Sequence, residues 1–185
     1  NVPCIAFINK CDRSGANPWR VIEQLKEKLH HNPVAMEIPI GLDATFNGVV
    51  DLVNMKAVYF DGDNGEVIRE EEIPAELLDE AKQHREKLLD KASMFSDDLM
   101  EILLEDGDVP AQMLLDALRI GVLQRKITPV FMGSAYKNKG VQLLLDGVIN
   151  LLPNPAEIEN YAIDAKTEKK IPVANDDTKP TIALA

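Results

Sequence analysis

The chain has 185 residues, of which 45% are hydrophobic, and its formal net charge is −11. This much apolar material can bury one core or two small ones. A membrane span needs roughly 18 uninterrupted apolar residues, and the sequence contains no such run, so we expect no membrane contact. The two cysteines and three histidines match no metal-binding or redox spacing, and we expect no metal site.

The beginning of the chain follows the pattern of an α/β unit. The apolar run at residues 2–8 predicts a buried strand, because it is too short and too uniformly apolar for an amphipathic helix. Asn17 predicts a helix N-cap, with Pro18 at the first helical position. Three apolar residues at helical spacing are expected to face the core: Val21, Leu25 and Leu29.

The middle of the chain changes pattern at residue 34. Three short apolar stretches predict strands: residues 34–40, 48–53 and 56–60. A turn-rich hairpin tip occupies residues 61–65. Three longer stretches predict helices: residues 75–92, 96–104 and 110–123. Because a loop of about 90 residues needs a core of its own, we interpret this part as an inserted α+β subdomain.

The α/β pattern returns near the end. Residues 127–132 predict a second buried strand, and residues 140–152 predict a helix. Its inward face is expected to hold five apolar residues: Val141, Leu144, Leu145, Val148 and Leu152. We therefore expect an α/β fold in four parts: residues 1–33 (strand, loop and helix), 34–124 (insert), 125–153 (strand, loop and closing helix) and 154–185 (linker and the start of a further domain, from residue 181).

Negative charge is concentrated in the insert. Residues 61–108 contain 17 acidic and 5 basic residues, a net charge of −12, whereas the rest of the chain has a net charge of +1. Phosphate backbones repel such a segment, so we expect no direct nucleic-acid contact there. A protein with a basic face is the better partner. The alternative is a solvated helix surface, which is the commoner meaning of a charge run.

Two short loops, each directly after a predicted strand, carry the clearest chemical signal. Asn9, Lys10, Cys11 and Asp12 fit the N-K-x-D pattern that reads guanine, and Ser134-Ala135 follow the second strand. On its own N-K-x-D is a weak pattern, and Asn9 and Asp12 could simply form a polar turn. Its placement after a strand, with the second loop also after a strand, favours a guanine-base site.

The chemistry of guanine explains these residue types. Guanine presents two adjacent donors, N1–H and the exocyclic amine, and an ionised Asp12 can accept from both. Lys10 can lay its methylene stem along the base, while Asn9 can bond the base edge and neighbouring loops. A backbone N–H of the Ser134-Ala135 turn is expected to donate to O6, with the Ser134 hydroxyl bracing the loop.

The phosphate half of such a site has no counterpart in this sequence. A P-loop reads G-x-x-x-x-G-K-[ST], and the chain contains no Gly-Lys dipeptide. It also starts directly before a strand and without Met. We therefore expect a piece of a longer protein that hydrolyses no GTP by itself and contains no catalytic residue.

Residues 8–13 (I-N-K-C-D-R), 133–142 (G-S-A-Y-K-N-K-G-V-Q) and 151–155 (L-L-P-N-P) together resemble translation elongation factor G. Residues 38–41, 48–52 and 73–75 resemble the insert of its GTPase domain, called G′. This resemblance implies the C-terminal part of a P-loop GTPase-type G domain. Its cofactor would be GTP or GDP, held through Asn9, Lys10, Asp12, Ser134 and Ala135, with Mg²⁺ bound only in the full-length protein.

The resemblance also implies the biological setting. The full-length protein would be a GTPase that drives translocation on the ribosome, and its acidic insert would meet the C-terminal domain of the ribosomal stalk protein. We expect a bacterial cytoplasmic protein. Residues 154–161 are similar to the mitochondrial-type branch and its bacterial relatives, which makes the mitochondrial matrix the alternative. Two other functions remain open: a ribosome-recycling or tetracycline-protection relative, and a protein-interaction module with vestigial nucleotide loops.

Overall fold

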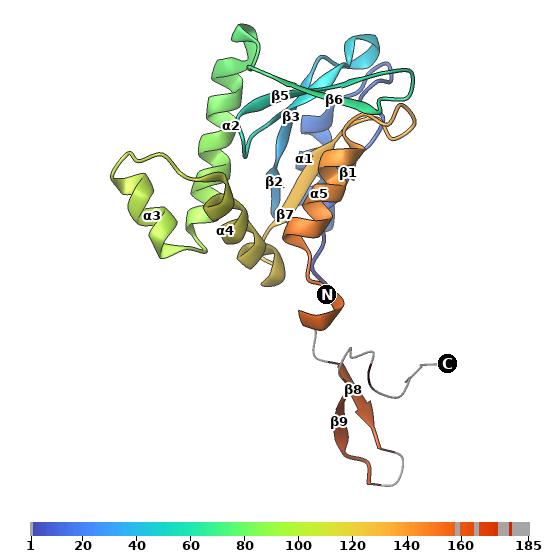
Figure 1. Ribbon diagram of the computed structural model, residues 1–185, viewed down its shortest axis with the longest axis vertical. Coiled ribbons are helices and arrows are strands. Elements are labelled where there is room, and N and C mark those ends of the chain that lie inside the picture. The colour runs from blue at the N-terminus through green and yellow to red at the C-terminus, as the bar shows by residue number, and fades with distance from the viewer. Residues whose placement is uncertain (1, 158–159, 165–166, 174–177, 179–185) are drawn as a thin grey trace. The chain divides into compact units, whose positions relative to one another are not determined.

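The computed structural model describes residues 2–157, 160–164, 167–173 and 178 (Figure 1). The chain divides into two compact units, Asn1–Leu152 and Pro153–Ala185. Within the second unit, a short 3-10 turn, η2 (Pro155–Glu157), precedes an antiparallel hairpin of β8 (Asn160–Ile163) and β9 (Lys170–Val173). The sequence predicts only a linker here, so this hairpin is a correction. The expected start of a further domain, at residues 181–185, lies outside the described residues.

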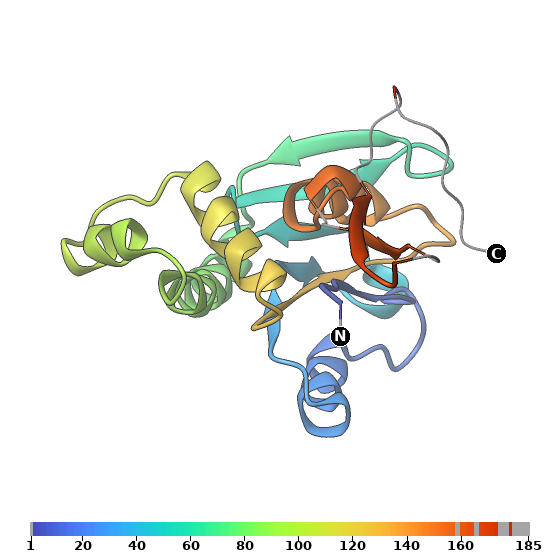
Figure 2. The same ribbon diagram turned by 90° about the horizontal axis from the view of Figure 1, so that it is seen from below.

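A three-stranded parallel sheet forms the frame of the first unit. Its order is β1 (Ala6–Ile8), β7 (Thr128–Met132) and β2 (Pro33–Ala35). All five residues of β7 are buried, which explains its mainly apolar sequence, since a central parallel strand is covered on both faces. Helices α1 (Pro18–Leu29) and α5 (Val141–Leu151) lie on opposite faces of the sheet (Figure 2).

The α1 helix begins as the sequence predicts. The Asn17 side chain accepts a hydrogen bond from the Arg20 backbone N–H at 3.0 Å, and Pro18 occupies the first turn. The predicted inward face is only partly right. Val21 is 37% and Leu29 61% exposed, whereas Leu25 packs against the core together with Ile22.

The insert contributes an antiparallel sheet and three helices. The sheet order is β3 (Glu37–Ile40), β4 (Gly48–Asp51), β5 (Lys56–Asp61) and β6 (Val67–Glu71), with the 3-10 helix η1 (Asp43–Thr45) between the first two strands. The helices are α2 (Ala75–Ser93), α3 (Asp97–Leu104) and α4 (Ala111–Leu123). Strand β6 is missing from the sequence prediction, because all five of its residues are exposed and they show no apolar alternation.

The strand predicted at residues 34–40 is two strands in two different sheets. Strand β2 pairs with β7 in parallel and β3 pairs with β4 antiparallel. Met36 lies between the two strands and is bonded to both sheets. Its N–H donates to Val130 O at 3.0 Å, and its carbonyl accepts from Leu52 N at 3.1 Å. Residues 33–35 therefore belong to the frame sheet, although the predicted insert starts at residue 34.

The insert also has no core that is separate from the frame. One buried cluster joins Ile38, Val50 and Leu88 of the insert to Phe131 and Leu151 of the frame. Arg85 of α2 fastens the turn after β4, because its guanidinium donates to the carbonyls of Leu52 and Val53 at 2.6 and 2.7 Å. The expectation of an independent core is thus wrong.

The inward face of α5 likewise differs from the prediction. Leu145 is 55% and Val148 40% exposed, while Leu144 packs against the core and Gly147 and Leu151 are buried. The small Gly147 lets the helix approach Phe131, whose ring would lie 2.3 Å from a Cβ atom added at this position. None of the described helices has the length and apolarity that would let it span a bilayer.

Glu37 is a buried carboxyl group where the two sheets meet. Its side chain is 1% exposed. Oε2 accepts a hydrogen bond from the Met132 N–H at 2.9 Å, but Oε1 has no partner among the described residues. Burial raises the pKa of Glu37 well above its usual range, even though the Met132 N–H favours the charged form, and the nearby Asp51 raises the pKa further. Glu37 therefore keeps its proton at pH values at which an exposed glutamic acid has lost it.

This raised pKa predicts a stability that falls as the pH rises. Above about pH 4.3 the unfolded chain releases the Glu37 proton while the folded chain retains it, so unfolding becomes easier up to the folded-state pKa. Glu37→Gln keeps an acceptor for Met132 and removes this penalty. We expect the free energy of unfolding of the wild type to fall more between about pH 4 and pH 8 than that of the variant.

Urea unfolding across this pH range measures the effect. The matched control is Glu70→Gln, on the exposed strand β6, which should leave the pH dependence unchanged. An identical pH slope in the wild type and Glu37→Gln would contradict the assignment.

Candidate guanine-base site

The two predicted loops meet at one edge of the frame sheet. Strands β1 and β7 are parallel neighbours with Ile8 opposite Met132, so their carboxyl ends lie side by side. Gly133 N donates to Ile8 O, and Cys11 N donates to Gly133 O, both at 3.0 Å. These bonds extend the pairing into both loops. Gly133 has no room for a side chain, because a Cβ atom there would lie 2.2 Å from Lys139 O.

Asn9 connects the two loops directly. Its Oδ1 accepts hydrogen bonds from the backbone N–H of Ala135 at 3.0 Å and of Lys10 at 2.8 Å. Lys10 has a φ of 68°, in the left-handed region, which turns the chain sharply after the strand. Both Asn9 and Lys10 are exposed. The structure therefore gives Asn9 the loop-bracing role that the sequence predicts.

Asp12 is held as a charged acceptor beside the second loop. Its side chain is only 9% exposed, and its Oδ2 lies 3.2 Å from Lys137 Nζ. The pKa of Asp12 is held below its usual range, mainly by a hydrogen bond from the Ser134 side chain and also by Lys137. Burial acts in the opposite direction. An ionised carboxylate at this edge suits two adjacent donors of a ligand. Ser134 thus braces the site through Asp12 as well as through its own loop.

The expected donor to guanine O6 is already engaged within the chain. Ser134 N donates to Lys139 O at 2.9 Å, and Ala135 N donates to Asn9 Oδ1. The loop closes further where Asn138 N donates to Ala135 O at 3.1 Å. A base carbonyl would therefore share the Ala135 N–H with Asn9 or take it over.

Two residues at the site are absent from the sequence prediction. Lys137 is the ionic partner of Asp12. Asp43, in η1, donates its N–H to Cys11 O at 2.9 Å and accepts from Ala16 N at 3.1 Å, which fixes the chain on both sides of Asp12. Lys137 has a local signal, since it lies two residues after Ala135, whereas Asp43 is brought in by the insert.

The cysteines and histidines take structural positions. Cys11 is buried, and burial raises the pKa of its thiol to about 11. Cys4 is half-buried. His31 lies 2.8 Å from Thr128 Oγ1, and His84 stacks on Trp19. Among the described residues, no group of three His, Cys, Asp or Glu could hold a metal ion.

Comparisons with known proteins now identify the family. Residues 1–154 match the family described as the elongation factor Tu GTP-binding domain. The chain belongs to this family. It is 56% identical to elongation factor G 1 of Syntrophus aciditrophicus over 185 residues, and 60% identical to elongation factor G 2 of Anaeromyxobacter dehalogenans over 186 residues. Each match covers 100% of this chain and 27% of the relative.

A crystal structure from Thermus thermophilus shares the fold. It superposes with a TM-score of 0.71 at 24% identity, over 84% of this chain and 23% of the other. The resemblance to elongation factor G and the predicted G-domain fold class are thus confirmed. The chain spans about a quarter of the length of the curated relatives it matches.

The Asn9 contacts predict how the two loops depend on each other. Asn9→Ala removes the acceptor of the Ala135 and Lys10 N–H groups, so both amides should exchange with solvent faster, by about fivefold for each 1 kcal/mol lost. Hydrogen exchange followed by NMR measures this. Asn9→Asp keeps an acceptor oxygen and is the matched control. Unchanged exchange at Ala135 in Asn9→Ala would show that the side chain does not hold the loop.

Proposed function

We propose that this chain is the guanine-base-recognition part of the GTPase domain of a ribosomal translocase of the elongation factor G type. The family match and the relatives' names support the class of protein. The observation that carries the proposed site is the ionised, braced carboxylate of Asp12 beside the Asn9–Ala135 contact. The cofactor is GTP or GDP, with Mg²⁺ bound only in the full-length protein.

Each site residue has a proposed role. Asp12 accepts from N1–H and the exocyclic amine of guanine, and adenine lacks that donor pair, so the carboxylate discriminates between the two bases. The exposed Lys10 covers one base face with its methylene stem. Ala135 offers its N–H to O6, and Asn9 and Ser134 hold the loops. None of the five is a catalytic residue.

The division of the chain remains part of the proposal. Residues 1–33 and 125–153 would form the G-domain frame around the insert at 34–124, with Pro33–Ala35 shared as a frame strand. The segment from residue 154 would lead to the next domain. Because the sequence contains no P-loop, the chain alone should hydrolyse no GTP. Turnover above the buffer rate, abolished by a substitution in this chain, would contradict that expectation.

The cellular setting follows from the relatives, which are bacterial elongation factors G. We place the full-length protein in the bacterial cytoplasm, with the mitochondrial matrix as the alternative. A ribosome-recycling or tetracycline-protection relative remains a second candidate within the class. An interaction module with vestigial loops is less well supported, because the two loops keep both the Asn9 bridge and the charged Asp12.

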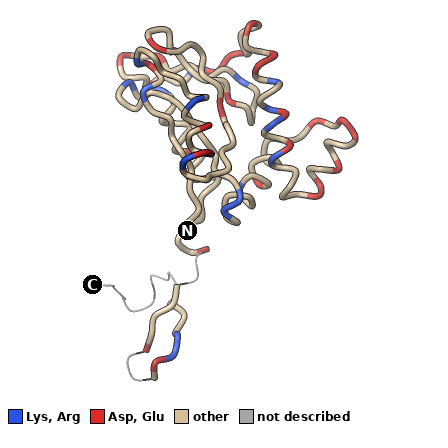
Figure 3. The backbone as a smooth tube through the Cα atoms, turned by 180° about the vertical axis from the view of Figure 1, so that it is seen from behind, with Lys and Arg blue, Asp and Glu red and all other residues tan. Residues whose placement is uncertain are grey.

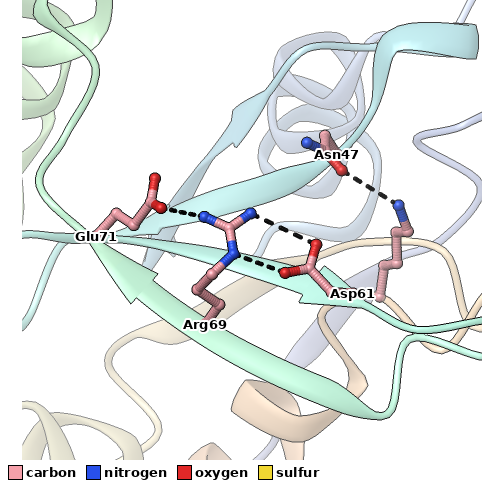
Figure 4. A network of polar contacts seen from close by, with 5 residues as sticks. Asn47, Asp61, Arg69 and Glu71 are labelled. Carbon is pink, nitrogen blue, oxygen red and sulfur yellow. Dashed lines mark hydrogen bonds and ion pairs between the residues drawn. The ribbon is translucent and has the colours of Figure 1, made fainter.

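The acidic insert is the proposed contact with the stalk protein's C-terminal domain. Acidic residues lie along α2 together with basic ones, whereas α3 and the loop after it carry acidic residues alone (Figure 3). On β6 the charge is balanced locally: Arg69 Nε donates to Asp61 at 2.6 Å, and Arg69 also pairs with Glu71 (Figure 4). On α2, by contrast, Glu76 and Asp79 are exposed and form no ion pair with any described residue.

The base assignment is tested by changing what Asp12 can accept. Xanthine carries an oxygen in place of the guanine exocyclic amine, so Asp12→Asn, which adds a donor, should weaken GDP and strengthen xanthosine diphosphate. We expect at least a tenfold change in their affinity ratio, since each charged hydrogen bond contributes about 1.5–3 kcal/mol. The measurement is competition binding to a full-length elongation factor G that carries this segment. An unchanged ratio would refute the role of Asp12.

The stalk contact is tested by reversing charge on α2. Changing Glu76, Asp79 and Glu80 to Lys should slow ribosome-stimulated GTP turnover several-fold and flatten its salt dependence, because attraction to a basic patch acts mainly on association. Nucleotide affinity should stay constant. The matched control changes Glu27, Asp116 and Asp146 to Lys, one exposed residue on each of α1, α4 and α5. If both triple variants behave alike, net charge rather than this face is responsible.

A further inference from the structure

A cavity of about 550 Å³ lies beside β2, between α1 and α2, away from both nucleotide loops. Its apolar lining includes Trp19, Ile22, Val34 and Leu88. This volume falls within the range of small-molecule sites, which are mostly apolar with a few polar groups that orient the ligand. All of the lining belongs to the first compact unit.

One wall of the cavity is an aromatic pair. The Trp19 and His84 rings are stacked with centroids 4.4 Å apart and an angle of 15° between their planes. Both rings are half-buried, so part of their surface remains open to the cavity. The stacking joins α1 to α2 and gives the cavity a rigid, flat apolar surface.

The rim of the cavity is basic in a chain whose net charge is −11. Four cations line it, namely Arg20, Lys26, Lys87 and Lys91, against the single carboxylate of Glu23. Lys91 is engaged, because its Nζ donates to Asn32 Oδ1. Arg20, Lys26 and Lys87 form no ion pair with any described residue.

The charged groups around the aromatic wall indicate the sign of the ligand. Burial lowers the pKa of His84 and the positive charge of Lys87 lowers it further, while Glu80 opposes them. The imidazole is therefore neutral at neutral pH, and it adds apolar surface to the wall. Three cations without carboxylate partners around a flat aromatic wall are complementary to a negatively charged group attached to a planar ring.

We propose that this cavity binds a small organic anion, a carboxylate or phosphate attached to a planar ring, with the ring against Trp19 and the charge between Lys26 and Lys87. The contact is independent of the guanine-base loops. It uses the C-terminal half of α2, whereas the proposed stalk contact uses Glu76, Asp79 and Glu80 at the N-terminal end of that helix.

Two probes with the same ring system test the requirement for charge. The first is 2-naphthoate and the second is the neutral 2-naphthylmethanol, each titrated into the 185-residue chain by calorimetry. Trp19 is the only tryptophan, so its indole N–H resonance in a ¹H–¹⁵N NMR spectrum reports on the cavity without assignment of the whole chain. Naphthoate should shift this resonance saturably and bind at least tenfold more tightly than the alcohol, and added salt should weaken it.

Lysine variants locate the charge. Lys26→Gln and Lys87→Gln should each weaken naphthoate about two- to fivefold, as expected for partly exposed ion pairs, and should leave the alcohol unaffected. The matched control is Lys82→Gln, because Lys82 is exposed on α2 but does not line the cavity. Equal affinity for the two probes, no saturable shift of the Trp19 resonance, or an equal loss in Lys82→Gln would each overturn the proposal.

Discussion

The parallel pairing of β1 with β7 is the contact on which the rest of the structure depends. These strands are separated by about 120 residues of chain, yet their register places Ile8 opposite Met132. Bringing such distant segments together costs loop-closure entropy, which grows only slowly with length and is offset by burial of the whole of β7. Without this pairing, Asn9 could not reach Ala135, and Asp12 could reach neither Ser134 nor Lys137.

Hydrogen bonds join the insert to β7 and to the loop that follows β1. Met36 is hydrogen-bonded to both β7 and the end of β4, and the buried Glu37 accepts from Met132 at the end of β7. Asp43 of the insert then holds Cys11 and Ala16 around Asp12. A structural change in the insert would therefore affect the base loops through the hydrogen bonds of Met36, Glu37 and Asp43. The shared core also makes independent folding of the insert and the frame unfavourable.

The sequence predicts elements well where local chemistry marks them. Asn17 and Pro18 mark the start of α1, and the mainly apolar run before Gly133 marks β7. The change of sheet at Met36 escapes prediction, because residues 34–40 are apolar except for Glu37 and read as a single strand. The inward face of α5 is ambiguous, since Leu145, Val148 and Ile149 are apolar but exposed.

The candidate site shows the same division between local and tertiary information. Asn9, Asp12 and Ser134 follow from a motif and from its place after a strand. Lys137 lies only two residues after Ala135, but its pairing with Asp12 depends on how the second loop folds back. The contacts of Asp43 depend on where η1 lies, which no spacing in the sequence records. The hydrogen bond of the Ala135 N–H also depends on tertiary structure, because its acceptor, Asn9, lies 126 positions away in the sequence.

Helix α2 shows how one element can serve two surfaces of opposite charge. Its first turn carries Glu76 and its last turn Lys91, an arrangement that complements the helix dipole. The same order places unpaired carboxylates at one end and the cations Lys87 and Lys91 beside the Trp19 cavity at the other. Arg85 anchors the middle of the helix to the carbonyls of Leu52 and Val53. Because this anchor lies between the two charged ends, the turn after β4 fixes the position of the helix for both proposed contacts.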